Sequence, residues 1–316
     1  MNPGQRLVLG LPGPDLDDST IELLSEKNVG GIVLFDCNAA DRKGLASLLE
    51  IIRNNVTPRP FVAVDFEGGR VRRLGKLFSR LGAPAEYHGS FGKLEADCRE
   101  IASEFGEVGI NVNLAPVADL THTPLNPALE GRTFSPDPDE AAEYCTAFCR
   151  GFAGHGVICC LKHFPGLGSA VNDPHEQVAV SCLSLGQVFE RDIVPFRAGF
   201  SQGADMLMTT HVKITDIENE IGTLSSKTTK LARYVGFTGV IITDDMSMGA
   251  LKKQGRSLPQ MALDALCSGH DLALICHDHD KHKEIIAHLE ENVHILERHG
   301  HDQSLRMIES VKKRLT

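Results

Sequence analysis

The sequence predicts an α/β protein that folds as a single (β/α)8 TIM barrel over residues 1–316. Short, almost continuous apolar runs alternate with helix-like segments, which is typical of parallel strands covered by helices on both faces. Eight such repeats over about 280 residues match the usual size of this barrel. No Gly-x-Gly-x-x-Gly follows the first apolar run, so a doubly wound open sheet that binds a dinucleotide is the weaker alternative.

Each strand is expected where an apolar run stops at a polar residue or at a Pro/Gly turn. The first four repeats predict strands at 7–11, 31–35, 61–65 and 111–116, with helices at 21–28, 42–54, 94–108 and 139–155. The last four predict strands at 157–162, 205–211, 239–244 and 271–276, with helices at 185–202, 227–235 and 258–268. Segments 281–291 and 303–314 are expected to be closing helices, and Gly68-Gly69 lies in a longer loop after the third strand.

The composition is that of a soluble globular protein, with 42% hydrophobic and 23% charged residues. The formal net charge of −10 argues against a nucleic-acid partner. No apolar run approaches the roughly 18 residues of a membrane span, and the first residues do not form a signal peptide. The nine cysteines are scattered and follow no framework spacing, so we expect them to be reduced thiols. We therefore expect a cytoplasmic monomer that needs no membrane, metal or cofactor.

One stretch, Lys162-His163-Phe164-Pro165-Gly166-Leu167-Gly168, is the strongest candidate for a site. An apolar run ends there and a Pro/Gly-rich loop begins, so a rigid strand end aims two polar side chains. Asp173-Pro174-His175 follows closely. A carboxylate that bonds to an imidazole orients it and favours its protonated form, so Asp173 and His175 form a candidate general acid and base. A turn aspartate beside an exposed histidine is the plainer interpretation.

Polar residues also close other predicted strands: Asp65, Asp119, His211, Asp244 and Asp245, with Arg132 on the loop after the fourth strand. In a barrel these strand ends meet on one face, where active sites are built. Because side chains alternate along a strand, the adjacent Asp244 and Asp245 are expected to face opposite ways. We expect Asp244 to point into the site and Asp245 to have a structural role, such as capping the next helix.

Several stretches resemble the signatures of family 3 glycoside hydrolases, in particular its bacterial single-domain β-N-acetylglucosaminidases. They run in order from about residue 31 to 276, and together they are specific although most are weak singly. The matching stretches are Asp65-Phe66-Glu67-Gly68-Gly69-Arg70-Val71, Leu114-Ala115-Pro116-Val117-Ala118-Asp119, Gly131-Arg132-Thr133-Phe134, Lys162-His163-Phe164-Pro165-Gly166, Asp173-Pro174-His175, Pro195-Phe196-Arg197, Met208-Thr209-Thr210-His211-Val212 and Thr243-Asp244-Asp245-Met246-Ser247-Met248.

The resemblance implies a retaining exo-glycosidase that hydrolyses terminal, non-reducing β-linked N-acetylglucosamine from a small saccharide or a muropeptide of cell-wall recycling. It implies Asp244 as the nucleophile, and His175 paired with Asp173 as the acid/base. An anionic Asp244 suits an oxocarbenium-like transition state, because that state is cationic. The resemblance further implies a sugar-binding set: Asp65, Arg70, Arg132, Lys162, His163 and Met248.

The sequence departs from the family pattern at three places. Leu167 stands where His is common, Pro174 where Ser is usual, and Phe66 where Gln is usual. These departures leave the exact sugar, the aglycone and the conformation of the loop undecided. The alternatives are a β-glucosidase, an N-acetylglucosaminide phosphorylase that uses the same site, or a catalytically silent sugar-binding protein.

Overall fold

Eight parallel strands form a ring in this computed structural model, which describes residues 2–170, 172, 178–252 and 255–315. The strand order is β11-β9-β7-β6-β3-β2-β1-β12, and a parallel bridge between Ile242 and Leu272 joins the two ends. The ring strands are β1 (Leu7–Gly10), β2 (Gly31–Leu34), β3 (Phe61–Val64), β6 (Val112–Asn113), β7 (Ile158–Phe164), β9 (Met206–Thr209), β11 (Val240–Ile242) and β12 (Ala273–Ile275). The predicted (β/α)8 barrel is therefore confirmed.

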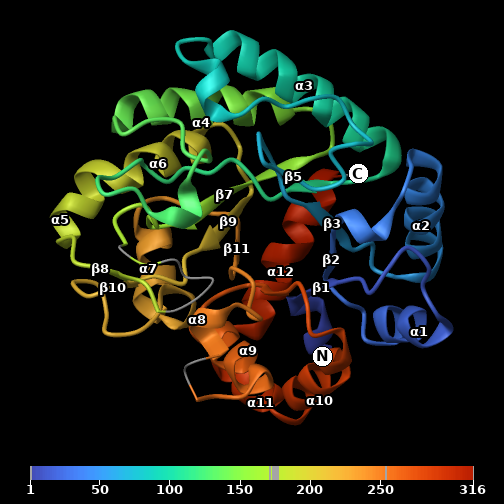
Figure 1. Ribbon diagram of the computed structural model, residues 1–316. Coiled ribbons are helices and arrows are strands. Elements are labelled where there is room, and N and C mark those ends of the chain that lie inside the picture. The colour runs from blue at the N-terminus through green and yellow to red at the C-terminus, as the bar shows by residue number, and fades with distance from the viewer. Residues whose placement is uncertain (1, 171, 173–177, 253–254, 316) are drawn as a thin grey trace.

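Helices surround the ring (Figure 1). They are α1 (Asp18–Glu26), α2 (Arg42–Asn55), α3 (Phe91–Val108), α4 (Pro138–Phe152), α5 (Leu185–Gln187), α6 (Ile193–Ser201), α7 (Ser226–Tyr234), α8 (Gly249–Lys252), α9 (Leu258–Cys267), α10 (His282–Glu291), α11 (Val293–Arg298) and α12 (His301–Lys312). Several begin at a residue whose side chain accepts a hydrogen bond from the first turn, as Asp17, Asp41 and Ser257 do. No helix in the described ranges is both long and apolar enough to cross a membrane.

The buried side chains form two layers, one inside the ring and one between the ring and its helices. Along β1, for example, Val8 points into the ring while Leu7 and Leu9 face the helices, because successive side chains alternate. Ile308 and Val311 of α12 belong to the inner layer. In Figure 1 this helix lies across the middle of the ring. The C-terminal helix thus fills the barrel at the end where the strands begin.

Two small strand pairs, absent from the sequence-based prediction, lie outside the ring. The loop after β3 contains an antiparallel hairpin of β4 (Phe66–Gly68) and β5 (Val71–Arg72). Beyond β7 and β9, β8 (Val180–Ser181) pairs in parallel with β10 (Lys213–Ile214). Both pairs lie on loops that follow strands, at the end of the barrel where the predicted site residues gather.

Two elements differ from expectation for local reasons. The fourth strand is only Val112–Asn113 and not 111–116. Asn113 uses its side-chain amide to bond the backbone N–H and carbonyl of Phe66, and Pro116 has no N–H to donate. The expected helix 185–202 is interrupted by a π turn at Val188–Asp192, between α5 and α6.

Candidate active site

A pocket of about 390 Å³ opens at the carboxyl ends of the ring strands. This volume lies within the range of small-molecule sites. Its lining draws on the last residues of β7 and β9 and on residues that follow β2, β3, β11 and β12, as a site at this face of a barrel should. It brings together seven of the predicted site residues: Asp65, Arg70, Arg132, Lys162, His163, Asp244 and Met248. Asp173 and His175 lie outside the described residues.

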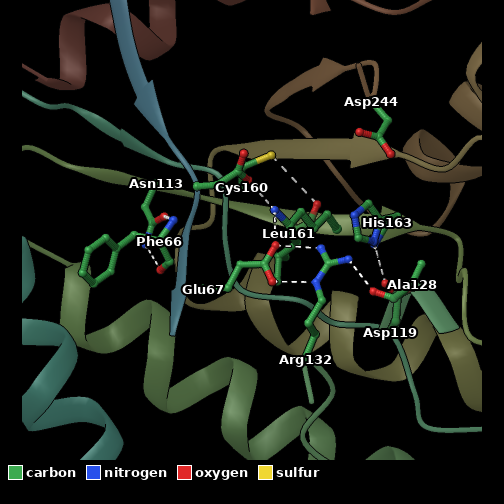
Figure 2. A network of polar contacts seen from close by, with 12 residues as sticks. Phe66, Glu67, Asn113, Asp119, Ala128, Arg132, Cys160, Leu161, His163 and Asp244 are labelled. Atoms are coloured by element: carbon green, nitrogen blue, oxygen red, sulfur yellow. Dashed lines mark hydrogen bonds and ion pairs between the residues drawn. The ribbon is translucent and has the colours of Figure 1, made fainter. Parts of the chain in front are cut away.

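A buried carboxylate, Glu67, organises one wall of this pocket. Its two oxygens accept from Arg132 in a fork, at 2.7 Å from Nη2 and 2.8 Å from Nε. The Lys162 ammonium lies 2.6 Å from Glu67 Oε1 and 2.6 Å from Asp65 Oδ1. Figure 2 shows the Glu67 carboxylate facing the Arg132 guanidinium, with Asp244 on a separate strand end. The Glu67 carboxylate therefore holds both cationic side chains in place.

The charges in this network hold one another ionised. Burial alone would raise the pKa of Glu67, but the nearby charges of Lys162 and Arg132 outweigh it and hold that pKa well below its ordinary value. Burial would likewise lower the pKa of Lys162, and Asp65 with Glu67 raises it above the ordinary value instead. The wall therefore presents two fixed cations and an anionic Asp65 to any molecule in the pocket.

A second buried carboxylate, Asp119, orients His163. Asp119 Oδ2 lies 2.7 Å from His163 Nδ1 and accepts from the His163 backbone N–H at 3.1 Å. Its other oxygen accepts from the Leu167 backbone N–H at 2.7 Å. A carboxylate at Nδ1 favours the tautomer with the proton there, which leaves Nε2 as the group available to a ligand. Asp119 therefore positions the imidazole ring of His163 and also the start of the loop that follows β7.

The adjacent aspartates on the β11 loop differ in their surroundings. Asp245 Oδ1 accepts from the backbone N–H of Ser247 at 3.0 Å and from that of Cys276 at 2.9 Å. This contact ties the loop to β12, which is a structural part. Asp245 also lines the pocket beside Asp244, so the two are not divided between pocket and support as expected. Asp244 lines the pocket, and one of its oxygens accepts from the Asp245 N–H at 2.8 Å.

Two further predicted residues prove to support the surrounding loops. His211 is buried, with Nδ1 at 2.6 Å from Thr223 Oγ1 and Nε2 at 2.8 Å from the Asp245 carbonyl oxygen, so both ring nitrogens are engaged. Arg70 donates to the carbonyl oxygens of Ala128 and Glu130 at 3.0 and 2.9 Å. It therefore braces one rim of the pocket while also lining it.

The rim on the opposite side carries an aromatic and cationic stack. The ring of Phe35 lies 5.2 Å from that of His277 between centroids, and the Arg73 guanidinium lies 5.9 Å from the Phe35 centroid. All three side chains line the pocket. Sequence analysis gave none of them a role, because nothing in their local pattern marks them.

The loop that leaves β7 packs against a hydrogen-bonded pair of side chains, His122 and Asp192. His122 Nε2 lies 2.9 Å from Asp192 Oδ1, and Asp192 is almost fully buried. Gly166 and Gly168 pass so close to this pair that a Cβ on either would meet one of its side chains. The β8–β10 pair fixes the far end of the same loop. The His122–Asp192 pair therefore supports residues 166–168, just before the stretch that contains Asp173 and His175.

Sequence reasoning missed the part that Glu67 plays, although Glu67 lies within a quoted motif. The signal available was its spacing, since Glu67 follows Asp65 by two residues and extended backbone repeats its side-chain direction every two residues. Its partners are 65 and 95 residues away along the chain, and only the fold brings them to it.

Comparison with known proteins agrees with this geometry. The family model described as "Glycosyl hydrolase family 3 N terminal domain" matches residues 7–311. A protein named beta-hexosaminidase from Stenotrophomonas maltophilia strain R551-3 is 34% identical over 282 residues, which are 86% of this chain and 83% of that protein.

Two solved structures share the fold. NagZ from Neisseria gonorrhoeae, in complex with N-trifluoroacetyl-D-glucosamine, superposes with a TM-score of 0.82 at 26% identity, over 97% of this chain and 92% of that one. A glycoside hydrolase family 3 beta-N-acetylglucosaminidase from Paenibacillus sp. str. FPU-7 gives a TM-score of 0.88 at 28% identity, over 99% of this chain and 61% of that one. With the family model matching nearly the whole ring, the chain belongs to glycosyl hydrolase family 3 and is a glycoside hydrolase.

Proposed function

We propose that this protein is a retaining exo-glycosidase that hydrolyses terminal, non-reducing β-linked N-acetylglucosamine. The observation that carries the proposal is the pocket that Asp244 lines together with the fixed cations Lys162 and Arg132. The beta-hexosaminidase name of the Stenotrophomonas relative and the beta-N-acetylglucosaminidase name of the Paenibacillus structure support the choice of sugar. The natural substrate would be a muropeptide fragment of cell-wall recycling, handled by a cytoplasmic monomer.

The proposed reaction has two steps. Asp244 attacks the anomeric carbon and forms a glycosyl ester, while the bond to the aglycone breaks and His175, oriented by Asp173, gives its proton to the leaving oxygen. Water then attacks the same carbon as His175 takes back a proton, which releases the sugar and restores the Asp244 carboxylate. Asp65, Lys162 and His163 would hold sugar hydroxyls, since each presents a polar side chain to the pocket.

Substrate preference tests the proposal directly. We expect 4-nitrophenyl β-N-acetylglucosaminide to be cleaved far faster than the matching β-glucoside, with no rate increase on adding phosphate. A preference for the glucoside would indicate a β-glucosidase. A phosphate-dependent rate that yields a sugar phosphate would indicate a phosphorylase. Saturable sugar binding without turnover would indicate a silent binding protein.

The nucleophile is tested by Asp244→Ala. We expect turnover of the aryl substrate to be abolished, because no other group would form the glycosyl ester. Asp245→Ala is not a suitable control, since it removes the bond to Cys276. Asp15→Ala is a better one, as Asp15 is exposed and is not among the residues that line the pocket. Activity of Asp244→Ala close to that of the parent would exclude it as the nucleophile.

The acid/base is tested by His175→Ala, with substrates that differ in leaving group. An activated aryl aglycone departs without protonation, whereas a sugar aglycone needs the proton in the first step. We therefore expect a much larger loss of kcat/KM for a disaccharide than for the 4-nitrophenyl glycoside. Equal losses on both substrates would mean that His175 is not the acid.

A further inference from the structure

A hollow of about 690 Å³ lies at the other end of the barrel. Its lining includes Gln5, Pro60 and Asn111, which come just before β1, β3 and β6, together with one side of α12. Residues that precede parallel strands lie at the opposite end of the ring from those that follow them. The α12 hollow, as we call it, is therefore separate from the pocket that contains Asp244.

Four cationic side chains line the α12 hollow. Lys313 is paired with Glu309, and the other three are Arg59, Arg306 and Lys312. Within the described ranges none of these three forms an ion pair or a side-chain hydrogen bond. Their neighbours behave differently, since Lys313 pairs with Glu309 at 2.7 Å and Arg314 with Asp205 at 2.8 Å. The lining also contains two carboxylates, Asp302 and Glu309, of which Glu309 is paired with Lys313, so the cavity keeps an excess of positive charge.

Lys312 is the most enclosed of the three. Its ammonium lies 4.9 Å from the centroid of the Phe61 ring, at the floor of the barrel. Burial lowers the pKa of Lys312 to about 8, and no carboxylate offsets that effect. A desolvated ammonium without an anion is unfavourable, so a ligand that supplied an anion here would be stabilised.

Much of the remaining lining is apolar. Pro58, Pro60, Leu305 and Ile308 offer hydrocarbon surface. The amide of Asn111 already bonds the Val62 N–H at 2.7 Å and the Pro60 carbonyl at 3.4 Å, so it has little left to offer a ligand. The cavity thus combines positive charge with apolar walls, and its size suits a small molecule.

We propose that the α12 hollow binds a small organic anion with an apolar body. Its carboxylate or phosphate would contact the Lys312 ammonium, and Arg59 and Arg306 would add attraction at the entrance. The apolar body would lie against the prolines that precede β3 and the inner face of α12. A long acyl chain and an aromatic acid share this chemistry, and probes of either kind distinguish them.

Octanoate, octylammonium and octan-1-ol form a matched set of probes, because they share a chain and differ in charge. Binding to the folded state raises Tm as the ligand saturates its site. We expect octanoate to raise Tm in a saturable way and to show one-site binding by calorimetry, with no comparable effect from the other two. Benzoate in the same assay tests the aromatic form of the ligand.

Lys312→Met tests the charge while keeping most of the side-chain volume. It should weaken octanoate binding roughly 10- to 100-fold, the loss expected for a bond to a charged group. Lys312→Arg should retain binding, and Lys43→Met, on the exposed surface of α2, should match the parent. Circular dichroism and turnover of the aryl glycoside check that each variant is folded. Equal shifts with all three probes, or parental affinity in folded Lys312→Met, would overturn the proposal.

Discussion

At the scale of single residues, Glu67 supports the site although it is not expected to touch the sugar. It contacts Lys162, which lies in β7, and Arg132, which lies in the loop before α4. A carboxylate placed between two buried cations offsets the cost of removing them from water. Glu67 is thus a positioning residue, and its loss would disturb two sugar-binding side chains at once.

We expect Glu67→Gln to lower the free energy of unfolding by about 3 kcal/mol, because it leaves two buried cations short of an anion. It should also reduce kcat/KM. Urea unfolding measures the first effect and the chromogenic assay measures the second. Glu107→Gln is the matched control, since Glu107 pairs with Arg42 on the surface and should change stability by less than about 1 kcal/mol. Equal stability of the two variants would contradict the role given to Glu67.

The same residue predicts a pH dependence. The pKa of Glu67 is depressed from its ordinary 4.5, so below that pH the unfolded chain binds a proton that the folded chain does not. Its stabilising contribution should therefore be complete above about pH 5.5 and should shrink as the pH falls below 4.5. The difference in unfolding free energy between the parent and Glu67→Gln, measured from pH 7 to pH 3, should narrow. A constant difference would show that the carboxylate does not titrate as inferred.

At the scale of elements, β7 and its loop connect the core to the chemistry. Lys162 and His163 lie within β7, and residues 166–168 then turn over the His122–Asp192 pair. Leu167 is buried, and its N–H is bonded to Asp119. The departure from the family pattern at Leu167 therefore places an apolar side chain in a packed position, while the backbone contact that fixes the loop does not depend on the side chain.

Gly168→Ala tests how closely this loop must lie. A Cβ at Gly168 would collide with the Leu120 carbonyl oxygen, so the backbone must shift. We expect a loss of about 1–3 kcal/mol in stability, typical of overpacking, together with a lower kcat/KM. Gly92→Ala is the control, because its Cβ would meet open space in the first turn of α3 and should leave stability equal or up to about 1 kcal/mol higher. A Gly168→Ala protein as stable as the parent would show that the loop backbone can shift to accommodate a Cβ without loss of stability.

The sequence predicted the repeating elements well and the contacts between them poorly. Asp65 and Asp244 mark the ends of β3 and β11 to within two residues, because a polar residue after an apolar run is visible locally. The fifth strand, by contrast, continues past Lys162 to Phe164. The β4–β5 hairpin was not predicted, since its strands are too short to show a period. The contacts of Glu67 and Asp119 depend on segments far apart in sequence, and a single sequence carries no signal for those.

At the scale of the whole molecule, the two ends of the barrel have separate tasks. The carboxyl ends of the strands hold the pocket with Asp244, and α12 closes the other end with Ile308 and Val311. Substitutions at the α12 end should therefore lower stability without changing how the pocket binds its substrate.

Ile308→Ala tests this separation. Removing a buried side chain from the floor should cost about 2–5 kcal/mol of unfolding free energy. The KM of the folded enzyme for the chromogenic substrate should stay unchanged, because the pocket is built at the opposite end. Gln303→Ala, exposed on the same helix, should alter stability by less than about 0.5 kcal/mol. A large change in KM for Ile308→Ala would mean that the two ends are coupled.

The stack at the rim of the pocket has an optical consequence. The chain contains no tryptophan, so its fluorescence excited at long wavelength has no intrinsic source. Phe35 is half-buried between Arg73 and His277, where it borders the pocket. A single tryptophan introduced as Phe35→Trp would therefore be the molecule's one indole emitter, placed where a sugar entering the pocket displaces water from its ring. Binding of a sugar could then be measured as a change in tryptophan fluorescence, without a chromogenic aglycone.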